Sequence, residues 1–180
     1  MTTTDIHVMR APADDCFNVA ADVERWPEIL PHYRWVHFHE KRGFGNGRVE
    51  MAAWRDFLGP LRYPTWWVSE MRVDVTEPAV YYRHVDGITR GMNVKWAFQS
   101  LPGRTTRVVL THSWSGPSWP LIGGIAWRHV IGPHFVSAIA RRTLAGVAAE
   151  AERRANRTER PPVHALSRTP DSNDTDARHD

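Results

Sequence analysis

Residues 133–154 read PHFVSAIARRTLAGVAAEAERR, and this stretch decides the fold. Ala, Leu and Arg dominate it, all of which favour helices, and Pro133 suits a first helical turn because its missing N–H would find no partner there. Apolar residues recur every three or four positions from Phe135 to Ala151, whereas Arg and Glu fill much of the other side. The pattern predicts one long amphipathic helix, whose apolar stripe must pack against another layer.

The preceding chain supplies that layer as segments in which apolar and polar residues alternate, joined by short turns. The clearest is 65–75, where apolar or small residues from Trp67 to Val75 alternate with charged ones. Similar strands are expected at 3–10, 33–41, 48–54, 79–85, 90–100 and 105–114. Short turns favour antiparallel pairing, and two short helices are expected after the first strand, at 16–21 and 22–30. We therefore predict an α+β fold in which a curved seven-stranded antiparallel sheet surrounds the long C-terminal helix.

Composition is typical of one domain, with 180 residues of which 42% are hydrophobic. We place this domain at 1–155 and expect the polar segment 156–180 to be a disordered tail. A net charge of only +3 makes nucleic acid an unlikely partner. The single Cys16 forms no disulfide framework, and we find neither a signal peptide nor an apolar run long enough to span a bilayer. A cytoplasmic location is therefore expected.

Nine tryptophans indicate a wide apolar interior with polar groups at its edges. A helix cannot fill a curved sheet from end to end, so we predict an internal cavity for a hydrophobic small molecule. The alternation and the helix stripe give these candidate ligand-binding residues, some of which line the cavity while others only pack: Trp35, Met51, Trp67, Ser69, Met71, Trp96, Phe98, Trp114, Phe135 and Ile139.

Two sets of histidines are candidates for chemistry. His112 shares an apolar face with Leu110 and Trp114, where it is either a hydrogen-bonded core residue or a functional group. His37 and His39 share another face, but no third ligand at a suitable spacing follows, so we expect neither a metal nor a cofactor.

The loop ahead of the long helix carries an apolar patch made of Trp119, Leu121, Ile122, Ile125 and Trp127. These residues either cap the cavity or form a gate that opens for the ligand and touches a membrane or a carrier protein. We favour the gate.

The order of elements, together with DVERWPEILPHY at 22–33, resembles the helix-grip superfamily. This superfamily includes the lipid-transfer START domains, the pollen-allergen fold and the bacterial polyketide cyclases/aromatases. The segments WVS at 67–69 and MNVKW at 92–96 look most like the cyclase/aromatase branch, and a looser similarity extends to the coenzyme Q-binding proteins. The resemblance covers residues 3–153.

The cyclase branch implies a specific chemistry. A poly-β-keto chain enters the cavity on an acyl carrier protein, folds, closes a ring and loses water, while a tyrosine and an arginine hydrogen-bond the carbonyl oxygens. The tyrosine falls on Tyr33, but Met71 takes the position of the arginine and Arg72 is expected to face outward. Arg55 is a possible substitute because it continues the inner face of its strand. Tyr33, Arg55 and His112 are thus the candidate catalytic residues.

Three functions remain open at this stage. The chain is a polyketide cyclase and dehydrase (aromatase), or it is a non-enzymatic carrier of a quinone or another lipid in which Tyr33 and His112 only orient the ligand. The third possibility is a macromolecular interaction module that acts at the ribosome, against which the weak net charge argues.

Overall fold

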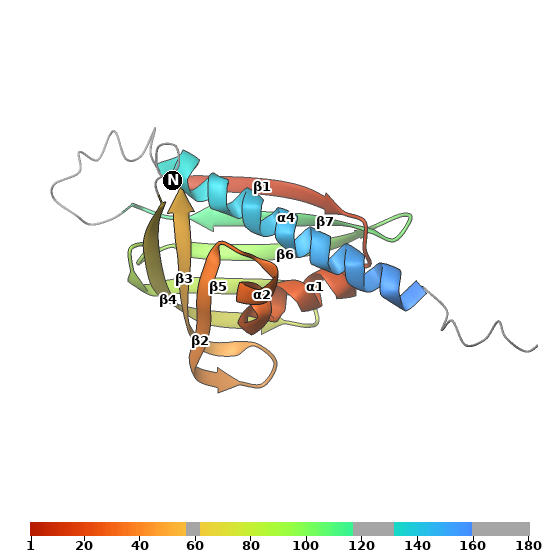
Figure 1. Ribbon diagram of the computed structural model, residues 1–180, viewed down its shortest axis with the longest axis horizontal. Helices are drawn as coiled ribbons and strands as arrows, with labels where there is room; N and C mark the ends of the chain where they lie inside the picture. The colour runs from red at the N-terminus through yellow and green to blue at the C-terminus, as the bar shows by residue number, and fades with distance from the viewer. Residues whose placement is uncertain (57–61, 117–131, 160–180) are drawn as a thin grey trace, which may run out of the picture.

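The computed structural model describes residues 1–56, 62–116 and 132–159. Seven strands form one antiparallel sheet in the order β1-β7-β6-β5-β4-β3-β2. The long helix α4 (Gly132–Glu159) lies along the concave face of this sheet (Figure 1). The predicted α+β helix-grip architecture is confirmed.

The element bounds follow the alternation seen in the sequence. The strands are β1 (Thr2–Met9), β2 (Tyr33–Arg42), β3 (Asn46–Asp56), β4 (Arg62–Asp74), β5 (Ala79–Gly87), β6 (Asn93–Leu101) and β7 (Thr105–Ser113). Between β1 and β2 lie α1 (Ala13–Ala21), the 3-10 helix η1 (Val23–Arg25) and α2 (Trp26–Ile29). Pro12 is the N-cap residue of α1, and Asp14 and Asp15 lie in its first turn.

The sheet bends strongly, so that β3 and β4 run across the direction of β6 and β7 (Figure 1). Register shifts accompany the bend in β2, between Tyr33 and Trp35 and between Phe38 and Glu40. An extra residue in one strand increases the local twist and turns the following side chains to the other face. The bend leaves an interior between the sheet and α4.

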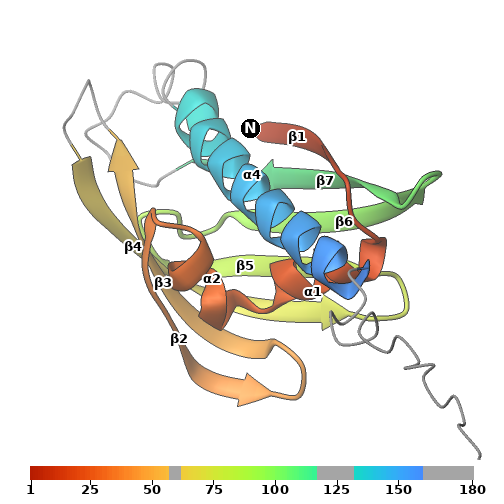
Figure 2. The same cartoon turned by 45° about the vertical axis from the view of Figure 1, so that its right-hand side comes forward.

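Helix α4 has 28 residues and is therefore about 42 Å long. Its buried positions include Val136, Ala140, Leu144, Val147 and Ala151, which confirms the predicted stripe. The C-terminal half of α4 packs on α1 (Figure 2).

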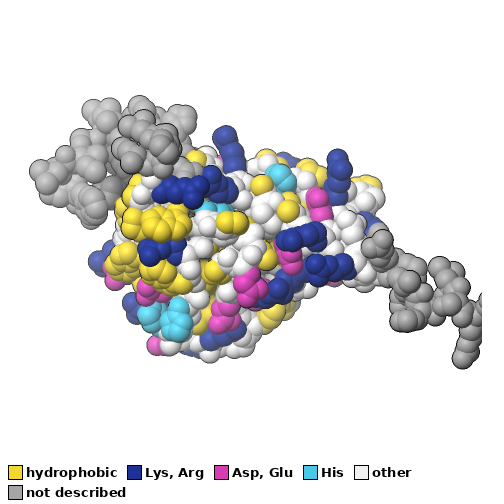
Figure 3. Space-filling view, viewed as in Figure 1, with side chains coloured by type: hydrophobic (Ala, Val, Ile, Leu, Met, Phe, Trp, Pro, Cys, Tyr) yellow, Lys and Arg dark blue, Asp and Glu magenta, His cyan; other side chains and the backbone are white. Residues whose placement is uncertain are grey.

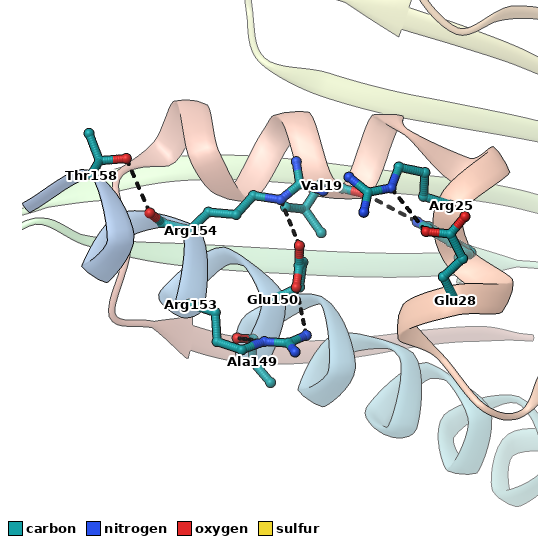
Figure 4. A network of polar contacts seen from close by, with 9 residues as sticks. Val19, Arg25, Glu28, Ala149, Glu150, Arg153, Arg154 and Thr158 are labelled. Carbon is teal, nitrogen blue, oxygen red and sulfur yellow. Dashed lines mark hydrogen bonds and ion pairs between the residues drawn. The ribbon is translucent and has the colours of Figure 1, made fainter. Parts of the chain in front are cut away.

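Ion pairs order the last turns of α4. One carboxylate oxygen of Glu150 accepts a hydrogen bond from Nε of Arg154 at 2.8 Å, and the other lies 2.6 Å from a guanidinium nitrogen of Arg153 (Figure 4). Nearby, Arg25 pairs with Glu28 at 3.2 Å across η1 and α2. The chain after β1 is tied to the same helix, because the backbone N–H of Arg10 donates to Glu152.

The convex face of the sheet carries some of the tryptophans. Trp35 and Trp66 expose 38% and 47% of their surface, and the Arg34 guanidinium lies 4.7 Å from the Trp35 ring and 4.6 Å from the Trp54 ring. Figure 3 shows hydrophobic side chains gathered among Lys and Arg over this end of the sheet. The tryptophans therefore lie on the convex face of the sheet as well as in the interior.

Some of the sequence-based expectations concern residues that the structure does not describe. The proposed gate residues Trp119, Leu121, Ile122, Ile125 and Trp127 lie outside the described residues, as does the chain after Glu159. None of the helices in the described ranges combines the length and apolarity that a bilayer crossing requires.

Candidate functional site

A cavity of about 70 Å³ lies between the concave face of the sheet, α2 and α4. All three candidate catalytic residues line it, namely Tyr33 from β2, Arg55 from β3 and His112 from β7. Most of the remaining wall is aromatic or aliphatic. Ligand pockets for drug-sized molecules commonly have volumes of about 300–1,000 Å³, so this interior is small.

A chain of aromatic rings explains the small volume. The ring centroids of Trp96 and Trp26 are 6.0 Å apart, those of Trp26 and Tyr33 are 5.0 Å apart, and those of Tyr33 and Trp67 are 6.1 Å apart. Trp67 then stacks on His84 at 5.9 Å with an interplanar angle of 14°. These rings occupy much of the space that the bent sheet encloses.

Tyr33 enters the cavity because of the bulge at the start of β2. Tyr33 pairs with Ala53 and Trp35 pairs with Ala52, so Arg34 is the extra residue and the two aromatic side chains point to opposite faces. Trp35, a predicted ligand-binding residue, therefore lies outside the cavity: its indole is on the convex face, 3.4 Å from Glu50. Burial raises the pKa of Tyr33 to about 12, and the Thr143 hydroxyl and the Arg55 charge offset part of this rise.

Arg55 is a buried cation, with only 7% of its surface exposed. Its Nε donates to the Thr65 hydroxyl at 3.2 Å, and its guanidinium lies 5.6 Å from the Trp67 ring. Burial lowers its pKa to about 10, and the neighbouring Tyr33 and Tyr63 oppose this shift. Arg55 therefore stays charged at neutral pH, in a place where its hydrogen bonds to a ligand would be strong.

Two histidines stand on the same wall. Burial, with contributions from His112 and Arg55, lowers the pKa of His84 to about 3, and its Nδ1 lies 2.6 Å from the Thr89 hydroxyl. Burial lowers the pKa of His112 to about 4, with Asp5 opposing and Arg55 assisting the shift. Both imidazoles are neutral at physiological pH.

The candidate ligand-binding residues divide into three groups. Those that line the cavity are Met51, Trp67, Trp96 and Ile139. Ser69, Met71, Phe98 and Trp114 lie away from it: Ser69, Met71 and Trp114 are buried, and Phe98 is packed on the core. Trp35 lies on the convex face, as described above, and the side chain of Phe135 is outside the described residues.

Sequence reasoning missed several cavity residues. Tyr82 and His84 follow Val80 on β5 at two-residue spacing, so the alternation of that strand could have identified them. Trp26 and Thr143 come from helices, and only the packing of those helices brings them to the cavity.

No group of three or more His, Cys, Asp or Glu side chains in the described ranges could hold a metal ion. The rings of His37 and His39 are 5.8 Å apart on the convex face, where His39 lies 3.0 Å from Glu50.

Solved structures share this architecture. The Zhui aromatase/cyclase from Streptomyces sp. R1128 is 24% identical, with a TM-score of 0.67, over 86% of this chain and 94% of that chain. A protein from Thermus thermophilus has a TM-score of 0.70 at 17% identity, over 86% of this chain and 99% of its own. A START superfamily protein from Mycobacterium smegmatis has a TM-score of 0.60 at 13% identity, over 87% and 98% of the two chains. At these identities the likeness shows the fold.

No curated protein is significantly similar to the chain in sequence. The family model for polyketide cyclase / dehydrase and lipid transport, however, matches residues 9–130, which is more than half of the chain. This match includes the strands that carry Tyr33, Arg55, Tyr82, His84 and His112. The chain belongs to the polyketide cyclase / dehydrase and lipid transport family.

Proposed function

We propose that this chain binds a hydrophobic, aromatic or polyketide-like small molecule in the cavity and promotes its cyclisation and dehydration. The supporting observation is that a buried phenol, Tyr33, and a buried cation, Arg55, line one cavity whose other walls are mostly aromatic and aliphatic. The family and the Streptomyces aromatase/cyclase of the same fold support this class of ligand.

The chemistry needs a carbanion stabilised by neighbouring carbonyl groups. When a proton leaves the carbon between two ketones, negative charge develops on an oxygen, which Arg55 and Tyr33 would stabilise by hydrogen bonds. Tyr33 acts as a neutral donor, because its pKa is about 12. The larger contribution comes from holding the nucleophilic carbon against the ketone that it attacks.

His112 would carry the proton in this reaction. Its imidazole is neutral at physiological pH because its pKa is about 4, so it can accept the proton from the carbon. A base of this strength holds a proton weakly and would pass it to the alkoxide formed by ring closure, which becomes a hydroxyl. In the dehydration, His112 would take the second proton of the same carbon and pass it to this hydroxyl, which then leaves as water. The proton balance therefore closes within the cavity.

Ligand binding requires the aromatic side chains to move. A cavity of about 70 Å³ is smaller than the roughly 150 Å³ cavity that accommodates benzene in an apolar protein core. The rings of Trp26 and Trp67 flank Tyr33 and line the cavity with it. Binding should consequently change the intrinsic tryptophan fluorescence.

The test is to add the purified protein to a minimal polyketide synthase, whose acyl carrier protein presents the chain as a thioester. We expect a shift towards cyclised, dehydrated aromatic products, and a loss of about 10²-fold in their formation rate in Arg55→Met and Tyr33→Phe. Arg72→Met is the matched control, because Arg72 is exposed and pairs with Asp74 on the convex face. An unchanged product spectrum with the wild type would contradict the proposal.

A second candidate function is a carrier that binds a lipid or quinone without chemistry. It is favoured by Met71, an apolar residue at the position where the cyclase resemblance would place an arginine. Native mass spectrometry of protein purified from bacteria should then show a bound lipid. A ligand-free mass together with no binding of added quinones would count against this candidate.

A further inference from the structure

Unpaired polar atoms gather on the concave face of the sheet. Within the described residues, six buried side-chain nitrogen or oxygen atoms have no hydrogen-bond partner, and five of them belong to sheet residues. These five residues are Thr3, Asp5, Ser69, Tyr82 and His112. Burying a polar group without a partner costs free energy, so such atoms are rare unless a water or a ligand completes them.

Two of these residues, Tyr82 and His112, also line the cavity. Tyr82 pairs with Val94, and Val94 pairs with His112, so the three lie in one row across β5, β6 and β7. Neighbouring strands are about 4.8 Å apart, which separates the two polar residues by about 10 Å at the backbone. The shorter Val94 side chain lies between them and also lines the cavity.

Both groups are uncharged and suit a neutral oxygen. Tyr82 exposes only 6% of its surface, and burial together with nearby Tyr33 raises its pKa well above the usual value. His112 is neutral, and its partnerless Nδ1 donates or accepts according to its tautomer. A ligand hydroxyl can donate to one of these groups and accept from the other, and a carbonyl oxygen can accept from either.

We infer that Tyr82 and His112 form a second polar contact in the cavity, which selects ligands carrying a neutral hydroxyl or carbonyl oxygen in addition to the one held by Tyr33 and Arg55. This second contact, which rests on the proposed function for the presence of a ligand, makes Tyr82 a specificity-determining residue. Oxygenated aromatic molecules are the class of ligand that fits both contacts.

Replacing Tyr82 with phenylalanine distinguishes a hydroxyl that has no partner in the ligand-free protein from one that stabilises the fold. If the hydroxyl has no partner in the ligand-free protein, Tyr82→Phe should leave the Tm unchanged or raise it, since no hydrogen bond is lost. If the hydroxyl is part of the structure, for example through a fixed water, the same substitution should lower the Tm. Tyr81→Phe is the matched control, because Tyr81 is the adjacent residue of β5 and packs under Arg72 on the convex face.

Binding is measured by tryptophan fluorescence with three probes: naphthalene, 2-naphthol and 2,7-dihydroxynaphthalene. We expect the wild type and Tyr81→Phe to bind the dihydroxy probe about tenfold more tightly than 2-naphthol, which corresponds to one hydrogen bond of about 1.4 kcal/mol. Tyr82→Phe should lose this preference and keep its affinity for 2-naphthol.

The outcomes separate this inference from the proposed function. If Tyr82→Phe keeps the tenfold preference, or if its Tm falls, the second contact is overturned while ligand binding stands. If the wild type binds all three probes equally well, the second contact is likewise overturned. If it binds none of them, the proposed function fails as well.

Discussion

Nε2 of His32 lies 3.0 Å from the Thr143 hydroxyl, which joins the start of β2 to the middle of α4. Both side chains are buried. The next residue after His32 is Tyr33, whose phenol reaches the cavity and whose raised pKa the Thr143 hydroxyl partly offsets. One hydroxyl on the helix therefore holds the strand end that delivers the phenol.

Replacing Thr143 with valine should remove the hydroxyl that contacts His32 and should therefore destabilise the fold. Thr143→Val removes a buried acceptor and donor at constant shape, so we expect the free energy of unfolding to fall by about 1–2 kcal/mol. Urea denaturation measures this change. Thr158→Val is the control, because Thr158 is exposed on the last turn of α4, and an equal loss in both variants would contradict the assignment.

Gly146 allows α4 to approach α2 closely. A Cβ atom at this position would lie 2.1 Å from Cδ2 of Leu30, a side chain that is fully buried. Gly146→Ala should therefore destabilise the protein by about 1–3 kcal/mol through overpacking, although alanine favours the helix by about 1 kcal/mol. In a Leu30→Val background the cost should be smaller, because the clashing methyl group is gone. A cost that is identical in both backgrounds, measured by urea denaturation, would argue against this contact.

Stability should fall in mild acid because of His84 and His112. Their folded pKa values are about 3 and about 4, against 6.5 for an ordinary histidine. Below pH 6.5 the unfolded chain therefore binds protons that the folded chain does not. The stability that the two neutral histidines contribute is fully present above pH 6.5. It is lost as the pH falls, at up to about 1.4 kcal/mol per pH unit for each histidine.

Urea denaturation between about pH 7 and pH 5 checks this slope. The double variant His84→Gln/His112→Gln should show a shallower dependence on pH than the wild type. His37→Gln should keep the wild-type slope, because His37 lies on the convex face, away from the cavity. A wild-type stability that does not change across this range would disprove the assignment.

Cys16 should be unreactive in the folded protein. Its side chain is fully buried in α1, and burial raises the pKa of its thiol to about 11, so little thiolate is available. We expect a disulfide reagent such as DTNB to modify it only upon unfolding. Thr4→Cys in a Cys16→Ala background is the positive control, since Thr4 is exposed on β1. Equal rates for the two thiols would show that Cys16 is accessible.

Much of the fold followed from periodicity. Alternation over β3 placed Arg55 on the same face as Met51, and both line the cavity. The three-to-four residue spacing of the C-terminal segment predicted which side of α4 is buried. These patterns are local, because each side chain direction depends on the backbone of its own element.

Other features depend on more than one element and could not be predicted in this way. The outward position of Trp35 results from the bulge at Arg34, which no alternating pattern reveals. The contribution of Thr143 depends on where α4 lies relative to β2. The small cavity volume results from three indoles from different elements packing together.

The extra residue at Arg34 has a consequence for how such chains diversify. Inserting one residue into β3 opposite Arg34 would give Arg34 a partner and put Tyr33 on the same face as Trp35, out of the cavity, while the pairing further along β2 is retained. Ligand preference can therefore change through a change in chain length, without any substitution among the residues of the wall.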